Sequence, residues 1–270
     1  MTFGTRWIFL SPHLDDAVLS CGGMIAEIAK TAHVEIWSIF TRAPLRGPYS
    51  HAAQWLHSIS GGHTGSRLAA LRRAEDRAAC KVVGASAVHL PFVEALYRRR
   101  SDGRFLYRHA LQGSIHPSDR ALIEKIANEL KKSLRPGDRV VAPLAIAGHA
   151  DHLVTREAVH SVIDKGLVYY VEIPYLEGRE EKVAALTASM WNLRFLPSAE
   201  SLDRWVHGAH KYKSQVPMLH GASGSIEDVI RRYAGTGKVT LFTPSEQLAR
   251  SVGRHESFSM SSPAEPENVA

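Results

Sequence analysis

The sequence predicts a single α/β domain in which a mainly parallel sheet is covered by helices on both faces. Short apolar runs typical of buried strands alternate with longer segments of helical periodicity. This order of strand, helix, strand and helix favours parallel pairing through crossover helices. The 270-residue length suits one large domain, and the chain contains no internal repeat or clear domain boundary. The predicted architecture is therefore Rossmann-like.

The predicted strands are short and mostly rich in β-branched or aromatic residues. They cover residues 7–11, 34–40, 86–90, 139–144 and 167–173. Pro91 is expected to close the third strand, because proline cannot donate a hydrogen bond to a sheet.

The predicted helices have apolar residues spaced by three and four positions. They cover residues 17–30 and 68–83, a segment after the caps Ser118 and Asp119, a segment that follows GHADH and reaches about residue 164, and segments near 180–190, 201–213 and 225–234. In the segment after Ser118 and Asp119, the apolar stripe consists of Leu122, Ile123, Ile126 and Leu130. The pair Gly22-Gly23 costs the first helix about 1 kcal/mol per glycine relative to alanine. We therefore expect this helix to approach the sheet closely at the pair.

Residues 41–65 and 92–117 are predicted to be long loops, and loops of this length are frequently functional. The folded domain is expected to span residues 1–250. Residues 251–270 are polar and rich in proline, serine and glutamate, which predicts a disordered tail.

The composition indicates a soluble globular protein, with 44% hydrophobic and 22% charged residues. No apolar run approaches the roughly 18 residues needed to span a membrane, and no signal peptide is visible. The two cysteines form no disulfide framework. These features predict a cytoplasmic protein.

The net charge of +6 leaves open a nucleic acid, an anionic substrate or only a soluble surface. The basic residues are scattered apart from one run, Arg98-Arg99-Arg100, which is either a solvated loop edge or a phosphate-binding patch.

Two clusters of histidine and aspartate follow predicted strands, where ligands bind in open α/β sheets. The first contains His13, Asp15 and Asp16, and the second contains His149, Asp151 and His152. Taken alone, an aspartate at this point would be an ordinary helix cap. Two such clusters together favour a metal site, because two imidazoles and one carboxylate are a recurring catalytic zinc set. A remaining carboxylate can then act as general base and a remaining histidine can stabilise an oxyanion.

The stretches HLDDAVLSCGG (residues 13–23) and GHADH (residues 148–152) resemble the two motifs of the PIG-L/LmbE-like family of zinc-dependent N-acetylglucosaminyl deacetylases. Arg72 and Glu75 in LRRAEDRAAC resemble the Arg-x-x-Glu helix of this family. The resemblance covers roughly residues 5–250 and departs at Leu14 and Ala150, where relatives usually carry proline.

The resemblance implies a role for each residue of the two clusters. The implied zinc ligands are His13, Asp16 and His152, the general base is Asp15, the oxyanion-stabilising group is His149, and the residue that orients His149 is Asp151. Arg72 is expected to reach the substrate, and Glu94 lies near the position where many relatives carry an aspartate at the sugar pocket.

We therefore expect a zinc-dependent hydrolase that removes an N-acetyl or other N-acyl group from an amino sugar or glycoconjugate, with Fe²⁺ as an alternative metal in the cell. No nucleic-acid partner and no membrane span are expected, and the sequence is compatible with a homo-oligomer. Two other readings are a basic nucleic-acid-binding protein and a different α/β hydrolase, although G-x-S-x-G and phosphate-binding glycine motifs are absent.

Overall fold

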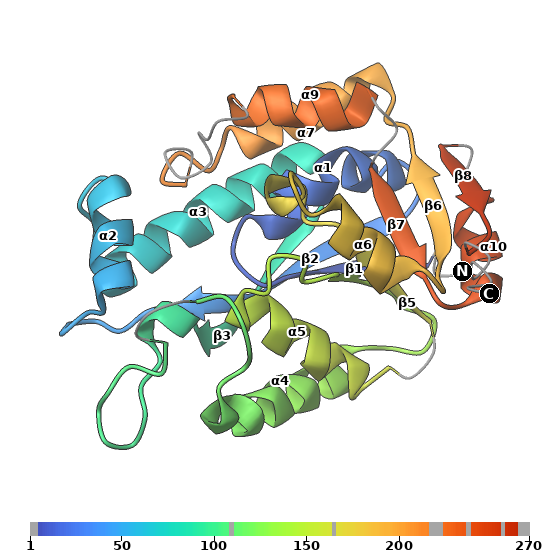
Figure 1. The fold of residues 1–270 in the computed structure, drawn as a ribbon. Helices are drawn as coiled ribbons and strands as arrows, with labels where there is room; N and C mark the ends of the chain where they lie inside the picture. Colours follow the sequence, from blue (N-terminus) through green and yellow to red (C-terminus); the bar gives the residue numbers. More distant parts are fainter. Residues whose placement is uncertain are drawn as a thin grey trace.

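A computed structural model describes most of the chain. The described residues are 5–107, 111–163, 166–215, 224–235, 239–254 and 257–263. They form an α/β fold with a twisted central sheet and helices on both faces (Figure 1). The predicted fold class is confirmed.

The sheet of the described residues has eight strands in the order β3-β2-β1-β4-β5-β7-β6-β8. The strands are β1 (Arg6–Ser11), β2 (His33–Arg42), β3 (Ser86–Val93), β4 (Arg139–Pro143), β5 (Leu167–Tyr170), β6 (Trp191–Phe195), β7 (Thr240–Thr243) and β8 (Phe258–Ser261). The first five strands pair in parallel, whereas β7, β6 and β8 continue the sheet in antiparallel pairs.

Helices cover the sheet as two layers (Figure 1). The helices are α1 (Asp16–Ile28), α2 (His51–Ile59), α3 (Gly65–Val83), α4 (Arg120–Ser133), α5 (Ala150–His160), α6 (Glu180–Thr187), α7 (Ala199–Ala209), α9 (Ile226–Gly235) and α10 (Glu246–Val252). Short 3₁₀ turns are η1 (Ala95–Tyr97), η2 (Pro117–Asp119) and η3 (Ile173–Tyr175). Alternation along β1 separates the two cores, since Phe9 packs with α1, α3 and α7 while Leu10 packs with α4 and α5.

The strand order reverses direction between β1 and β4. The chain runs from β1 outward to β2 and β3, and then returns to place β4 on the other side of β1. The two strands pair in parallel, so the loops after them leave the same edge of the sheet. This is the topological switch point at which open α/β sheets bind ligands.

Two predictions of irregular structure were wrong. The predicted loop 41–65 contains α2, which Ser50 caps by accepting a hydrogen bond from the backbone N–H of Ala53. The predicted tail contributes β8, which pairs with β6. Alternating apolar residues are too few in so short a strand to be recognised from sequence, and its pairing partner is distant in the chain.

Region 180–250 also holds β6 and β7, which were not predicted. Pro91 does not close β3, which continues to Val93. Proline is tolerated there because β3 is an edge strand, whose outward N–H groups need no partner in the sheet. The helix predicted to reach about residue 164 ends at His160, and residue 164 itself lies outside the described residues.

The glycine pair in α1 packs against α7, so the expected close approach to the sheet was wrong. A Cβ atom added at Gly22 would lie 2.3 Å from Cδ1 of Trp205, and one added at Gly23 would lie 2.8 Å from Cε3 of the same ring. Trp205 is fully buried and donates its indole N–H to the carbonyl of Leu19. The two glycines therefore make room for the largest side chain of the helix–helix contact.

We expect Gly22→Ala to lower the free energy of unfolding by about 1–3 kcal/mol, because the added methyl group overpacks the buried indole ring. Urea unfolding followed by circular dichroism measures this change. Gly235→Ala in α9 is the matched control, since a Cβ atom there meets no atom within 4 Å and the helix gains up to about 1 kcal/mol. Equal effects of the two substitutions would contradict the packing explanation.

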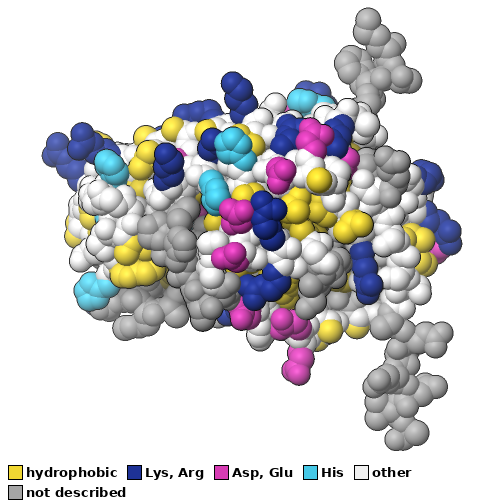
Figure 2. All heavy atoms as spheres, turned by 90° about the horizontal axis from the view of Figure 1, so that it is seen from above, with side chains coloured by type: hydrophobic (Ala, Val, Ile, Leu, Met, Phe, Trp, Pro, Cys, Tyr) yellow, Lys and Arg dark blue, Asp and Glu magenta, His cyan; other side chains and the backbone are white. Residues whose placement is uncertain are grey.

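The face over α7 and α9 carries basic and acidic side chains that are interspersed across it (Figure 2). Among the described residues, no helix combines the length and apolar character required for a membrane span.

Candidate metal and catalytic site

The loop after β1 brings a histidine and two aspartates to the switch point. Asp16 is the first residue of α1, and its Oδ2 accepts a hydrogen bond of 2.8 Å from the backbone N–H of His13. Asp15 does not cap the helix with its side chain. Instead, Ser11 Oγ accepts a hydrogen bond from the N–H of Ala17 and donates one to the carbonyl of His13. Asp15 therefore does not act as a side-chain cap of α1, and capping does not explain why an aspartate stands at this position.

The loop after β4 supplies the second cluster at the start of α5. His149 is the N-cap residue, and its Nδ1 accepts a hydrogen bond of 3.1 Å from the backbone N–H of Asp151. This bond fixes the proton of a neutral His149 on Nε2, so that nitrogen is a donor. His152 lies in the first turn of α5 and is fully buried.

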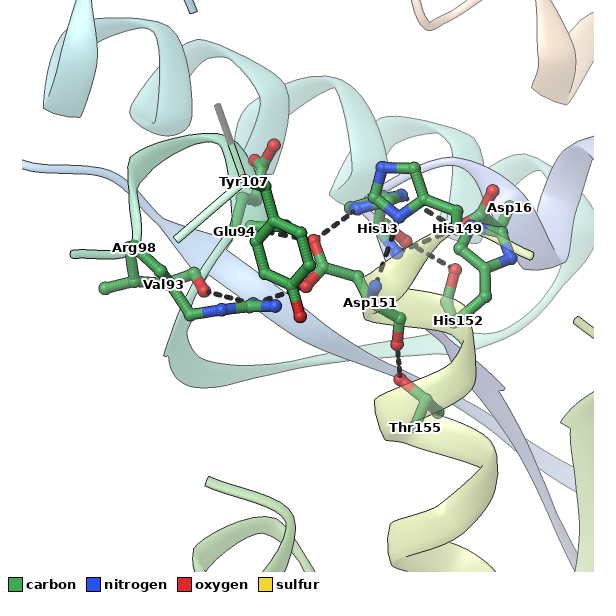
Figure 3. A network of polar contacts seen from close by, with 12 residues as sticks. His13, Asp16, Val93, Glu94, Arg98, Tyr107, His149, Asp151, His152 and Thr155 are labelled. Atoms are coloured by element: carbon green, nitrogen blue, oxygen red, sulfur yellow. Dashed lines mark hydrogen bonds and ion pairs between the residues drawn. The ribbon is translucent and has the colours of Figure 1, made fainter. Parts of the chain in front are cut away.

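The two clusters meet across the switch point (Figure 3). Asp16 Oδ2 lies 3.3 Å from His13 Nδ1 and 3.3 Å from His152 Nε2. The ligand atoms of these three residues all lie within 4.8 Å of one another. The ring of His149 stands edge-on to that of His13, with 4.9 Å between the centroids.

A buried nitrogen without a hydrogen bond shows that these residues fit a metal ion. His152 Nε2 is buried and makes no hydrogen bond, although Asp16 Oδ2 is close to it. A buried imidazole nitrogen left without a partner is costly in a folded protein. Two imidazole nitrogens and one carboxylate oxygen that converge in this way form a ligand set for a divalent metal.

Carboxylates on the far side of both imidazoles select the tautomers that metal binding requires. Glu172 Oε1 lies 3.0 Å from His152 Nδ1, and Asp151 Oδ2 lies 2.9 Å from His13 Nε2. Each carboxylate accepts a hydrogen bond from the N–H of the outer nitrogen, so that a neutral imidazole presents the lone pair of its inner nitrogen to Asp16. Metal-bound histidines usually donate their other ring N–H to a carboxylate, a carbonyl or a water molecule in this way.

A second group of potential ligands, formed by His13, His149 and Asp151, also lies within 4.8 Å. Its carboxylate is already engaged, because Asp151 accepts hydrogen bonds from His13 Nε2, the N–H of Ala95 and the guanidinium of Arg98. In addition, His149 Nδ1 is occupied by a backbone N–H. The group around Asp16 is therefore the better metal site.

The charges at the site shift the pKa values of its residues in opposite directions. Burial opposes ionisation of Asp16, yet the adjacent imidazoles of His152 and His13 hold its pKa well below the usual range. Burial and the neighbouring Asp16 raise the pKa of Asp15 to about 6. Burial and the charge of His13 lower the pKa of His149 to about 3, so His149 is a neutral donor near neutral pH.

Arg72 and Glu94, the two predicted substrate-binding residues, lie beside Asp15. Arg72 projects from α3, and its guanidinium donates a hydrogen bond of 2.8 Å to Glu94 Oε1. The other guanidinium nitrogen lies 3.9 Å from Asp15 Oδ1. Both Arg72 and Glu94 are buried, at 4% and 3% exposure. The structure therefore brings all eight predicted site residues to one edge of the sheet.

The structure corrects the expected contact of Asp151. Its side chain does not orient His149 but holds His13, while its backbone N–H holds His149. The reason is that Asp151 lies inside the first turn of α5, two residues after the N-cap, and is completely buried. From there its carboxylate faces the loop after β1.

Arg98 is a site residue that the sequence analysis misses, because the run Arg98-Arg99-Arg100 predicts a solvated loop edge or a phosphate-binding patch. Its guanidinium pairs with Asp151 and lies 2.9 Å from Asp119 Oδ2. It also lies over the rings of Phe40 and Tyr107. Arg99 and Arg100 are exposed, as a loop edge would be.

Glu172 was also missed. It lies just after β5, the neighbour of β4, and is fully buried. An acidic residue that directly follows the apolar run LVYYV was the available signal, since a buried carboxylate requires a partner. The two departures at Leu14 and Ala150 place apolar side chains in the interior, each 1% exposed.

Comparison with known proteins gives a family match and several similar deacetylases. Residues 8–163 match the PIG-L family, described as GlcNAc-PI de-N-acetylase. A 2'-N-acetylparomamine deacetylase from Streptomyces fradiae is 28% identical over 180 residues, which is 65% of this chain and 59% of that protein. The chain thus spans less than two thirds of this relative's length.

Solved structures of similar fold include two teicoplanin deacetylase structures. The zinc-inhibited form superposes with a TM-score of 0.77 at 27% identity, over 88% of this chain and 97% of that chain. A complex with teicoplanin has a TM-score of 0.71 at 25% identity, over the same shares.

Proposed function

The chain belongs to the PIG-L family, since the match covers more than half of its residues, and we propose that it is a metal-dependent N-deacetylase. The reaction is hydrolysis of an N-acetyl or other N-acyl amide on an amino sugar or an amino-sugar conjugate. The observation that carries the proposal is the convergence of His13, Asp16 and His152 beside the carboxylate of Asp15, which does not cap α1. The deacetylases that resemble this chain support the same reaction.

Zinc is the proposed metal, and ferrous iron is the alternative in the cell. Two imidazoles with one carboxylate suit zinc and leave a coordination position open. When bound, the metal supplies a Lewis acid that polarises the amide carbonyl and makes water acidic enough to attack at neutral pH. His13, Asp16 and His152 would hold it.

Asp15 is proposed as the general base. Its carboxylate is adjacent to the metal ligand Asp16 in the chain and is not committed to a helix cap. The guanidinium of Arg72, 3.9 Å away, stabilises the carboxylate form that accepts a proton. Asp15 then takes the proton from the attacking water and is placed to return it to the departing amine.

His149 is proposed to stabilise the negative charge that develops on the carbonyl oxygen. Its Nδ1 accepts a hydrogen bond from the backbone N–H of Asp151, so the Nε2–H of the neutral ring is the donor for the oxyanion. The carboxylate of Asp151 positions His13 rather than taking part in proton transfer.

Arg72 and Glu94 are proposed to shape the part of the site that receives the sugar. Their mutual ion pair fixes both side chains at the end of β3 and along α3. Because the curated relative acts on 2'-N-acetylparomamine and the structural one on teicoplanin, the proposed substrate class is an N-acylated amino sugar, free or joined to a larger group. A small-molecule glycoconjugate is therefore the expected partner, and a cytoplasmic location remains a prediction.

Acetate release from a panel of N-acetyl amino sugars and their conjugates tests the proposal. We expect release with at least one member of the panel, complete loss after chelation and recovery after zinc is added. His152→Ala is expected to abolish release, because it removes a metal ligand. Release that persists in chelator, or in His152→Ala, would overturn the metal-dependent reaction.

A further inference from the structure

A cleft outside the metal site runs along the edge of the sheet. Its lining residues come from α3, the edge strand β3 and the end of β2, and its volume is about 540 Å³. Its lining includes Thr41, Arg42, Arg73, Arg77 and His89. Volumes of this order are typical of small-molecule sites in proteins.

Three arginines line this cleft, of which Arg42 and Arg77 are exposed and Arg73 is half-buried. Among the described residues, no carboxylate forms an ion pair with Arg42, Arg73 or Arg77. The guanidinium of Arg73 is half-buried and donates a hydrogen bond of 2.7 Å to the carbonyl of Thr41, which fixes its position. Burial and the charges of Arg77 and Arg42 lower the pKa of Arg73.

The acidic residues nearest in the sequence are occupied elsewhere. Asp76 is buried and accepts hydrogen bonds from Tyr212 Oη and from His89, whose Nε2 lies 2.7 Å from its Oδ2. Glu75 accepts hydrogen bonds from the backbone N–H and the hydroxyl of Ser214. Within the part of the chain that the structure describes, neither carboxylate therefore forms an ion pair with the three arginines.

Two of these arginines repel each other within α3. Arg73 and Arg77 are four residues apart, and like charges at this spacing destabilise a helix by about 0.2–0.5 kcal/mol. A bound anion would attract both guanidinium groups and so offset the repulsion between them. Guanidinium groups offer paired N–H donors that match the oxygens of phosphate.

We propose that the cleft of Arg42, Arg73 and Arg77 binds a phosphate group of a small phosphorylated ligand. The combined positive charge of three guanidinium groups is larger than the charge of one carboxylate and suits a multiply charged phosphate. The site is distinct from the proposed catalytic centre, because Arg72 points to Asp15 and Glu94 whereas Arg73 points to Thr41. The inference does not depend on the proposed deacetylation.

Isothermal titration of the full chain with inorganic phosphate tests the site, at constant ionic strength in a chloride buffer. We expect saturable binding that Arg77→Gln weakens about ten- to a hundredfold, which is the loss of one charge-assisted contact. Arg67→Gln is the matched control, because Arg67 lies exposed on the same helix and outside the cleft. Asp16→Ala should retain the binding, since the metal ligands are not involved. Sodium acetate should bind far more weakly.

Four outcomes would overturn the inference. They are no saturable binding by the wild type, equal weakening by Arg67→Gln and Arg77→Gln, loss of binding in Asp16→Ala, and equal binding of acetate. Circular dichroism of each variant establishes that it is folded. A second variant, Arg42→Gln, changes a residue at the end of a strand and should weaken phosphate binding to a similar degree.

Discussion

Asp15→Asn is expected to lower kcat for deacetylation by about 10²–10⁴-fold, because asparagine cannot accept a proton from the attacking water. The substitution preserves the size and shape of the side chain. Asp15 does not cap α1 with its side chain, so the helix start should remain intact. Steady-state kinetics on a substrate identified from the N-acetyl panel measures the effect.

The same variant should unfold at nearly the same urea concentration as the wild type. An unchanged kcat would show that another group is the base. A low kcat accompanied by a large loss of stability would show that Asp15 supports the fold instead.

Arg98→Ala is expected to lower the free energy of unfolding by about 3–5 kcal/mol, because it leaves two buried carboxylates without their cation. Those carboxylates are Asp151, which is fully buried, and Asp119, which is 2% exposed. The loss of contacts with the rings of Phe40 and Tyr107 adds to the effect. Urea unfolding followed by fluorescence measures it.

Arg100→Ala is the matched control in the same run of arginines. Its side chain is 51% exposed and lies 3.5 Å from Asp102, so its removal should change the free energy of unfolding by no more than about 0.5 kcal/mol. If the two variants were equally stable, the buried ion-pair network around Asp151 would not contribute as described.

The sequence was sufficient to predict that the two His/Asp clusters lie at the site, because both directly follow an apolar strand. The runs before His13 and before His149 identify β1 and β4, and the rule for parallel sheets then places both clusters at one edge. The resemblance to a known family supplied the individual roles. Local sequence was sufficient here because the reacting groups sit within a few residues of a recognisable strand end.

Contacts between distant segments could not be predicted in this way. Arg98 looks like its exposed neighbours, and only the fold brings it to Asp151 and Asp119. The contact between Gly22 and Trp205 likewise joins residues from two helices far apart in the chain. Tertiary packing determines these contacts, and neither of the two segments carries a periodic sequence pattern that would indicate its partner.

The antiparallel strands β6, β7 and β8 escaped prediction for a related reason. Each has only four or five residues, too few to show alternation clearly. Their pairing depends on neighbours that lie tens of residues away in the chain. Helix α2 was not predicted because it has few buried apolar residues, namely Ala53 and Leu56.

The metal content of two adjacent variants tests the central claim most directly. Asp15→Asn and Asp16→Asn make the same chemical change one residue apart, and the account gives them different roles. After purification with zinc and extensive dialysis, mass spectrometry of the metal should find roughly one ion per chain in the wild type and in Asp15→Asn. Asp16→Asn should contain far less. Full metal content in Asp16→Asn, or loss of metal in Asp15→Asn alone, would contradict the assignment of His13, Asp16 and His152 as the ligands.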